Sequence, residues 1–230
     1  MSDFNLDRRG LVTGAALIGL SSFVAAQDAV AAADSLFAPT QLPFDPASIA
    51  GLSEKLLTSH HDNNYVGAVK RLGAIETEIG ALDPSTSPGY RLNGLKREEL
   101  LAWNSMILHE IYFAGLGAPS QPGAKLAAAI ENDFGGVDRW RTQFVAMGEA
   151  LGGGSGWVVL AWSHRDRRLV NQWAADHSMS LVGSTPILVL DMYEHAYAID
   201  YGAKAAAYVA AFMKVINWGS ADANFARATG

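Results

Sequence analysis

The fold of this chain is constrained most by an apolar run that ends on an acid. Residues 186–190 read Pro-Ile-Leu-Val-Leu, and Asp191 follows them directly. Such a run predicts a buried strand, and the segment after it is compatible with a helix that carries His195, four residues beyond the acid. A carboxylate at a strand end and a histidine one turn later can face one point and bind a metal ion. Taken alone the pair is a weak signal, because an acid hydrogen-bonded to a histidine has the same spacing.

The composition limits the kinds of site that the chain can build. The chain has 230 residues, 50% of them hydrophobic, a formal net charge of -6 and no cysteine. The absence of cysteine excludes disulfides, thiolate metal sites and cysteine nucleophiles, so a metal site must use histidine and carboxylate. No basic block is present, and nucleic-acid binding is therefore not expected. The length suffices for one large domain or two small ones.

The first 33 residues are predicted to be a targeting segment. Arg8 and Arg9 precede an uncharged apolar run over 11–26, and alanine-rich candidate cleavage points follow near Ala26 and Ala33. This layout is typical of a twin-arginine signal peptide and predicts export to the periplasm or the extracellular space. The alternative is a retained membrane anchor, because the run is nearly long enough to span a bilayer. Its glycines, serines and threonine keep it only mildly hydrophobic, so we expect no stable membrane span after cleavage.

Two helical stretches are predicted in the first half of the remaining chain. Ser53 fits a helix N-cap, and apolar residues keep helical spacing from there to residue 80, with His60 on the apolar stripe and His61 beside it. A loop rich in proline follows at 83–89, and a second helical stretch at 96–116 carries His109 on its stripe. Helices joined in this way predict an antiparallel hairpin. A single inward histidine is usually a hydrogen-bonded core residue, but two on facing helices favour a shared ligand site.

The second half is predicted to mix helices and strands. The expected helices lie at 125–134, 137–151 and 203–218, and the expected strands at 157–162, 168–172 and 187–190. The strands are predicted to form a three-stranded antiparallel meander. The glycine run at 152–156 is not a phosphate-binding loop, because it lacks the P-loop pattern and enters a strand.

We therefore predict an α+β protein that combines an N-terminal antiparallel helical hairpin with a C-terminal α/β half built on a three-stranded antiparallel sheet. The predicted divisions are a signal peptide over 1–33, a helical-hairpin domain over 34–118 and an α+β domain over 119–230.

With these motifs in order, residues 42–218 resemble the iron/manganese superoxide dismutases. The motifs that carry the resemblance are Leu42-Pro43-Phe44, His60, His109-x-x-Tyr112-Phe113, Gly154-Ser155-Gly156-Trp157, Asp191-x-x-Glu194-His195-Ala196-Tyr197 and Asn217-Trp218. The resemblance implies an oxidoreductase whose small-molecule substrate is superoxide. Such an enzyme converts two superoxide anions and two protons to oxygen and hydrogen peroxide by redox cycling of a mononuclear iron or manganese.

The resemblance implies four metal ligands in each chain. They are His60, His109, Asp191 and His195. Three imidazoles and one carboxylate suit iron or manganese and leave a fifth position for solvent. One ion per chain is expected, with iron favoured on the weak ground that residues 105 and 177 depart from the family's glutamine patterns. Use of either metal stays open.

The choice between His60 and His61 as ligand rests on the register of the first helix. In the family, a serine lies seven residues before the ligand, and apolar residues lie nine, twelve and fifteen after it. Counted from His60, these positions hold a serine and three apolar residues. Counted from His61, they hold two glutamates, a lysine and a glycine. His60 is therefore the expected ligand.

Further residues are expected around the metal. His177 is predicted to act in catalysis by donating a hydrogen bond to the metal-bound solvent, because Ser105, at the family's other position for this group, is too short. The alternative for His177 is an ordinary loop histidine. Trp157 and Tyr193 are predicted to wall the cavity, and Tyr193 stands where the family usually has tryptophan.

The same register reveals departures at the family's gateway. Asn64 and Ala68 stand where the family has a histidine and a gateway tyrosine, and Ala198 replaces a tyrosine after the last ligand. We hypothesise that Tyr65 supplies the missing phenol and acts in catalysis. These departures leave a second function open, a dismutase-fold metal-binding protein with little or no turnover. A non-haem oxygenase, the third alternative, would have a compact H-x-D/E…H triad, which this chain lacks.

Glu194 lies between two of the expected ligands in sequence. The resemblance implies that it points away from its own metal and bridges to a ligand histidine of a partner subunit, which predicts a homodimer. The alternative is an exposed glutamate that is favoured at a helix start by the helix dipole.

Overall fold

The helix that carries the first histidine begins where the sequence predicts its cap. In the computed structural model, which describes residues 37–230, the Ser53 side chain accepts a hydrogen bond from the Leu56 amide at 3.1 Å. Helix α2 (Glu54–Ser59) starts behind this cap, after the short 3-10 helix η1 (Pro46–Ser48). The predicted signal peptide, residues 1–33, lies outside the described residues.

Helix α2 does not continue as an uninterrupted α-helix. It runs through a π-helical turn, η2 (His60–Tyr65), before α3 (Val66–Ala81) begins. A π turn carries more residues than an α turn, so side chains five apart can share a face. His60 and Tyr65 are both 1% exposed for this reason. Periodicity did not predict this turn.

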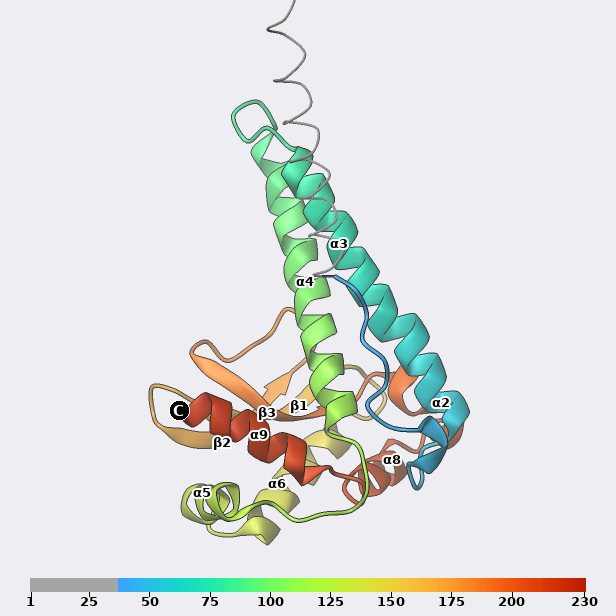
Figure 1. Cartoon of the computed structure of the whole chain (residues 1–230), viewed down its shortest axis with the longest axis vertical. Coiled ribbons are helices and arrows are strands. Elements are labelled where there is room, and N and C mark those ends of the chain that lie inside the picture. The colour runs from blue at the N-terminus through green and yellow to red at the C-terminus, as the bar shows by residue number, and fades with distance from the viewer. Residues whose placement is uncertain (1–36) are drawn as a thin grey trace, which may run out of the picture. The chain divides into compact units, whose positions relative to one another are not determined.

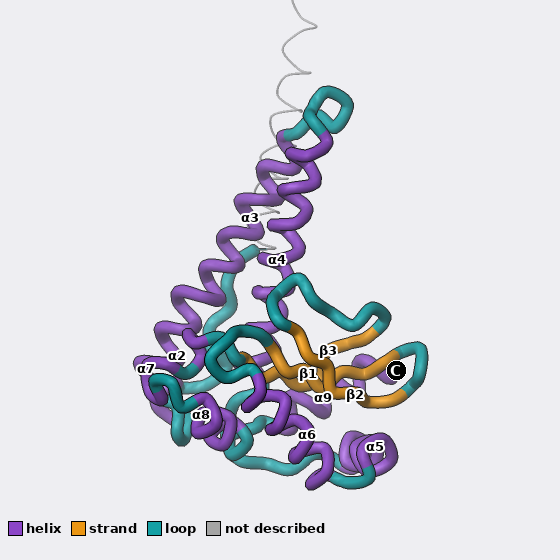
Figure 2. The backbone as a smooth tube through the Cα atoms, turned by 180° about the vertical axis from the view of Figure 1, so that it is seen from behind, coloured by secondary structure: helices purple, strands orange, loops and turns teal. Residues whose placement is uncertain are grey.

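The predicted antiparallel hairpin is confirmed. Helix α4 (Gly89–Ala114) packs along α3, and the loop between them lies at the end far from the sheet (Figures 1 and 2). The predicted start of the second helix is wrong, because α4 begins at Gly89 and not near residue 96. An ion pair at 3.0 Å between Arg91 and Glu78 of α3 helps to hold the first turn, although that turn contains a helix-disfavouring glycine.

The three-stranded antiparallel sheet is also confirmed, with strands β1 (Trp157–Ser163), β2 (Arg168–Ala174) and β3 (Ser184–Asp191). The predicted meander is wrong, since the strand order is β2-β1-β3 and β1 is central. Every residue of β1 except Trp162 is buried, as a central strand requires. Strand β2 has polar, partly exposed residues that suit an edge. The register pairs Trp157 with Asp191, which brings the end of β3 beside the start of β1.

Helices cover this sheet and complete the α+β fold. Helices α5 (Ala124–Phe134) and α6 (Val137–Ala150) match their predicted positions, and α6 packs on β1 and β2. Helix α4 packs on β3 together with the C-terminal helix α9 (Trp218–Thr229), which the sequence did not predict. In the part of the chain that the structure describes, no helix is both long and apolar enough to cross a bilayer.

The helix predicted at 203–218 is shorter than expected. Helix α8 (Ala205–Phe212) ends early because the next residues pair with the segment after α4. The amide of Gly117 donates to Val215 at 2.9 Å, and that of Asn217 donates to Gly115 at 2.8 Å. These bonds join the two halves of the compact unit formed by Pro39–Gly230. The domain boundary proposed near residue 118 stays a prediction.

Candidate metal centre

Four predicted ligand residues from four separate segments converge in the interior. His60 comes from η2, His109 from α4, Asp191 from the end of β3 and His195 from the 3-10 helix η3 (Glu194–Ala196). One candidate ligand atom from each lies within 4.8 Å of all the others. Three of the four side chains are buried, and that of His195 is 24% exposed. The cluster is therefore closed to solvent on most sides, and solvent reaches it on the side of His195.

The carboxylate of Asp191 lies at the centre of this cluster. Its Oδ2 is 3.1 Å from Nε2 of both His60 and His195, and 3.6 Å from Nε2 of His109. Its Oδ1 accepts a hydrogen bond from the Tyr193 amide at 2.8 Å. Burial alone would raise the pKa of Asp191, but interactions with His195 and His60 outweigh it and lower the pKa well below its usual range. The carboxylate is therefore ionised at neutral pH.

The main chain selects the tautomer of His109. Its Nδ1 lies 2.6 Å from the main-chain oxygen of Ser105, one turn earlier on α4. A carbonyl oxygen can only accept, so Nδ1 carries the proton and the Nε2 lone pair faces Asp191. Burial lowers the pKa of His109 to about 3, and the imidazole is neutral at pH 7. A neutral imidazole with a free Nε2 is the form that binds a metal.

The chemistry of the cluster fits a bound iron or manganese ion. Nδ1 and Nε2 of His60 and Nε2 of His109 are buried without a hydrogen-bond partner among the described residues. The 3.1 Å approach of His60 Nε2 to Asp191 lacks hydrogen-bond geometry. Buried polar atoms left unpaired are costly and rare in folded proteins. Three imidazole nitrogens and one carboxylate oxygen that converge in this way form the donor set that these two metals accept.

Aromatic side chains surround the four residues. The rings of Tyr112 and Phe113 lie 5.2 and 4.9 Å from His60, and that of Trp157 lies 5.2 Å from His109. All three aromatic residues are buried. They exclude water from the inner side of the cluster and so lower its local dielectric.

His177 lies beside the cluster, with 6.3 Å between its ring and that of His109. The indole N–H of Trp157 donates to His177 Nδ1 at 3.1 Å. An indole can only donate, so a neutral His177 carries its own proton on Nε2. Burial lowers the pKa of His177, which favours this neutral form.

Other predicted residues lie outside the group of four. His61 bonds through Nε2 to the Thr40 oxygen at 2.9 Å and through Nδ1 to Asp62 at 2.7 Å. The structure therefore brings His60, and not His61, into the cluster. The hydroxyl of Tyr65 lies 2.9 Å from Thr40 Oγ1 and donates to Glu110 at 3.0 Å. The structure thus directs this phenol to Glu110, and its proposed catalytic role stays a prediction.

The other predicted residues differ in how far they are buried. Ser105 is buried, and its hydroxyl lies 3.4 Å from His109 Nδ1. Asn64 is half-buried in η2, and Glu194 is exposed at the start of η3. Tyr193 stacks on His195 with 5.2 Å between ring centres.

Tyr208, which no sequence motif singled out, supports the main chain of Asp191. Its hydroxyl donates to the Asp191 main-chain oxygen at 2.8 Å and lies 3.2 Å from the Tyr112 hydroxyl. Tyr208 is fully buried, and its hydroxyl is the only side-chain polar group of α8. A lone hydroxyl in an otherwise apolar helix is the signal that could have identified it, because a buried phenol needs a partner.

Replacing Tyr208 by phenylalanine is expected to leave the fold intact but weaken it. The Asp191 carbonyl would lose a buried partner, at a cost of about 2 kcal/mol. For a chain of this size that corresponds to a fall in Tm of about 4–8 °C, measurable by calorimetry. Tyr90→Phe, at an exposed position, is the control and should leave Tm unchanged. Equal Tm values for the two variants would show that the Tyr208 bond contributes nothing.

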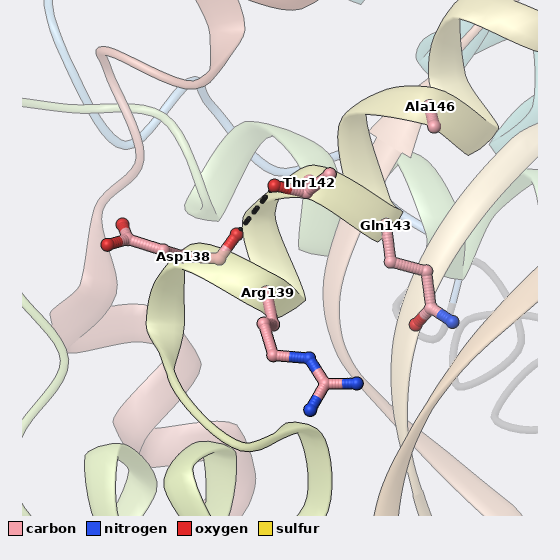
Figure 3. A pocket seen from close by; sticks show the side chains of 5 residues that line it. All are labelled: Asp138, Arg139, Thr142, Gln143 and Ala146. Carbon is pink, nitrogen blue, oxygen red and sulfur yellow. Dashed lines mark hydrogen bonds between the residues drawn. The ribbon is translucent and has the colours of Figure 1, made fainter.

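A hollow on the surface of α6 is not part of this centre. It has a volume of about 370 Å³ and is lined by Asp138, Arg139, Thr142, Gln143 and Ala146 (Figure 3). The Thr142 hydroxyl donates to the main-chain oxygen of Asp138 at 2.8 Å, so it is already satisfied within the helix. None of the four clustered residues contributes to this hollow.

The fold and the converging donors define an α+β protein with a mononuclear metal centre. Residues 122–224 match the family described as iron/manganese superoxide dismutases, C-terminal domain. The chain is 60% identical over 193 residues to "Superoxide dismutase [Fe]" of Cupriavidus metallidurans, covering 84% of this chain and 98% of that protein. It is 32% identical to "Superoxide dismutase [Fe]" of Aquifex pyrophilus, covering 80% and 88%. It is 31% identical to "Superoxide dismutase [Mn] 1" of Halobacterium salinarum, covering 81% and 94%.

These similarities span most of the chain and of each relative. The chain therefore belongs to the iron/manganese superoxide dismutase family.

Proposed function

We propose that the chain is a superoxide dismutase that converts two superoxide anions and two protons to oxygen and hydrogen peroxide. The proposed ligands of its iron or manganese are His60, His109, Asp191 and His195. The observation that carries the proposal is their convergence with three buried, unpaired imidazole nitrogens. A bound ion would supply a one-electron couple between its divalent and trivalent states.

The charge of the donor set suits an anionic substrate. Three imidazoles and one carboxylate would offset only one positive charge of a trivalent ion, so the loaded site would keep a positive local field. This field would attract a small anion although the whole chain carries a net charge of -6. The surrounding aromatic rings would strengthen the attraction, because they keep water out of the site.

His177 is proposed to hold one of the protons that the reaction requires. With Nδ1 occupied by the Trp157 indole, the Nε2–H of His177 is the group free to donate. A hydrogen bond from this N–H to solvent in the site would tune the electron affinity of the centre. Trp157 and Tyr193 are proposed as walls of the cavity that exclude water.

Replacing His177 by glutamine is expected to retain the metal while changing the chemistry. The metal content should stay within about twofold, whereas the dismutation rate should fall about 10–100-fold, as is typical for loss of an outer hydrogen-bonding partner. His164→Gln is the matched control, because His164, in the turn between β1 and β2, is exposed and bonds to Thr185 of β3. Unchanged turnover and midpoint potential in His177→Gln would remove this residue from the site.

The proposal is tested by superoxide loss in the metal-reconstituted protein, with metal content measured on the same sample. Stoichiometric metal without activity would favour the second candidate, a dismutase-fold metal-binding protein. That candidate is supported by the replaced gateway residues, Asn64, Ala68 and Ala198, and by the engagement of the Tyr65 phenol with Glu110.

Iron is proposed as the preferred metal. The relative with 60% identity is named for iron, whereas the relative from Halobacterium salinarum is named for manganese. Protein purified from cells grown with added iron or with added manganese, and then assayed for metal content and activity, tests this preference. Equal activity with the two metals would contradict it.

We further propose a homodimer in which Glu194 reaches a ligand histidine of the partner subunit. Support comes from its exposed position at the start of η3, one residue before His195. Light scattering coupled to size exclusion would measure the mass, and a monomer at micromolar concentration would refute the dimer.

Export by the twin-arginine route is proposed from the sequence alone. The support is the pair Arg8-Arg9 followed by the apolar run over 11–26. Cell fractionation with N-terminal sequencing would locate the protein and its cleavage site. A cytoplasmic chain with an intact N-terminus would refute the proposal.

A further inference from the structure

Tyr193 contacts two of the histidines through one ring. Its ring lies 4.8 Å from that of His177 with 9° between the planes, and 5.2 Å from that of His195 with 11° between the planes. Nearly parallel rings at these separations are stacked pairs, which are favourable beyond simple burial. One side chain therefore sets the ring planes of a proposed ligand and of the proposed proton donor together.

The main chain of Tyr193 is also tied to the site. Its amide donates to Asp191 Oδ1 at 2.8 Å, which fixes the start of the side chain relative to the carboxylate. The ring is therefore anchored at its base next to the carboxylate and can serve as a surface for its neighbours.

His177 needs such a surface. The Trp157 indole holds its Nδ1 at 3.1 Å, and the Asn104 amide holds its main-chain oxygen at 2.6 Å. Neither bond contacts the face of the imidazole, and the Trp157 ring, 5.5 Å away, is tilted by 50° from its plane. The residues on either side, Asp176 and Ser178, are exposed and offer no packing. The ring of Tyr193 lies nearly parallel to the imidazole and so restricts rotation of its plane.

We infer that Tyr193 is a positioning residue that locks the ring plane of His177 to that of His195, and thereby directs the free Nε2–H of His177. The inference rests on the proposed function for the roles of these two histidines. It goes beyond a cavity wall, because it assigns the orientation of the proton donor to the aromatic ring at position 193. The hydroxyl is secondary, since the ring makes both stacks.

The test compares Tyr193→Leu, which removes the ring, with Tyr193→Phe, which keeps it. NMR of the metal-free full chain reports hydrogen exchange of the Trp157 indole N–H and the tautomer of His177 from its ring nitrogens. In Tyr193→Leu the indole N–H should exchange about tenfold faster, the change that loss of a stacked aromatic contact permits. His177 should then populate both tautomers. In Tyr193→Phe, exchange should stay within about twofold of wild type and the single tautomer should persist.

Tyr90→Leu provides the matched control, because Tyr90 is 81% exposed and the same substitution there should change neither reporter. Unchanged exchange and an unchanged tautomer in Tyr193→Leu would overturn the inference. Equal disturbance in Tyr193→Phe and Tyr193→Leu would also overturn it, because the hydroxyl and not the ring would then be responsible.

A variant with a larger ring covers the case in which Tyr193→Leu does not fold. Tyr193→Trp should move the ring protons of both His177 and His195 further upfield, because an indole has the stronger ring current. Resonances that stay in place would exclude the stack. Both reporters are read without turnover, so an inactive protein with a locked His177 would refute the proposed function and leave this inference standing.

Discussion

Substitution of His60 by alanine is expected to abolish stoichiometric metal binding and dismutation together. His60 is buried, and its two ring nitrogens have no hydrogen-bond partner among the described residues, so removing it deletes one of four donors and breaks no hydrogen bond. The loss in metal affinity should exceed about a hundredfold, the upper range for loss of an outer partner of a ligand. Metal analysis of the purified variant after dialysis measures it.

The neighbouring histidine supplies the control. His61→Ala should keep the metal, because His61 bonds to Thr40 and Asp62 and not to the cluster. Circular dichroism of both variants would establish that each remains folded. Metal retained in His60→Ala and lost in His61→Ala would overturn the assignment of the first ligand.

Substitution of Gly156 by alanine is expected to be the most destabilising single change in the glycine run. Gly156 has a φ of 135°, and a Cβ there would lie 2.2 Å from the main-chain oxygen of Ala174. Because Ala174 pairs with Trp157 across the sheet, the clash cannot be relieved without moving β2 away from β1. Backbone strain and overpacking together predict a loss of about 4 kcal/mol. Thermal denaturation should show a fall in Tm of about 8–16 °C.

Two other glycines of the same run separate the effect of backbone strain from that of the steric clash. At Gly154 a Cβ would make only ordinary contact, 3.5 Å from the Leu151 oxygen, so alanine there should be nearly neutral. At Gly153 the φ is 80° but no atom lies within 4 Å, so alanine there should show the backbone strain alone, about 1 kcal/mol. Equal Tm values for Gly153→Ala and Gly156→Ala would show that the clash with Ala174 is relieved.

Local sequence signals predicted the elements of the fold better than their arrangement. The Ser53 cap, the two helices of the hairpin and the acid that ends β3 each depend on a few neighbouring residues. The strand order depends on a competition between β1 and β2 for the central position. Burial of nearly all of β1 decides that competition, and the more apolar sequence of β1 than of β2 is the signal that could have indicated it.

Two departures had physical causes that periodicity cannot register. The π turn at η2 adds residues to one turn of an otherwise regular helix, and apolar spacing alone does not reveal it. The early end of α8 results from pairing with the segment after α4, nearly a hundred residues earlier in the chain. The first is a local change in helical pitch, and the second depends on contacts between segments distant in sequence.

The family motifs predicted the four residues that the structure brings together, but not how they are held. The tautomers of His109 and His177 follow from a main-chain carbonyl and from an indole that happens to face the ring. Tyr208 was missed because its partner is a main-chain oxygen, which carries no sequence signal. Residue types can thus be inferred from motifs, whereas hydrogen-bond directions require the packed structure.

The four donors also have a consequence for the unfolded chain. More than a hundred residues separate His60 from Asp191, and the segments that carry them belong to the helical hairpin and to the sheet. An ion held by both halves would bind the folded chain and not the unfolded one, so it would stabilise the fold by mass action. With free metal at a thousandfold its dissociation constant, that stabilisation is about 4 kcal/mol. The metal-free chain would therefore open to proteases more often than the loaded one.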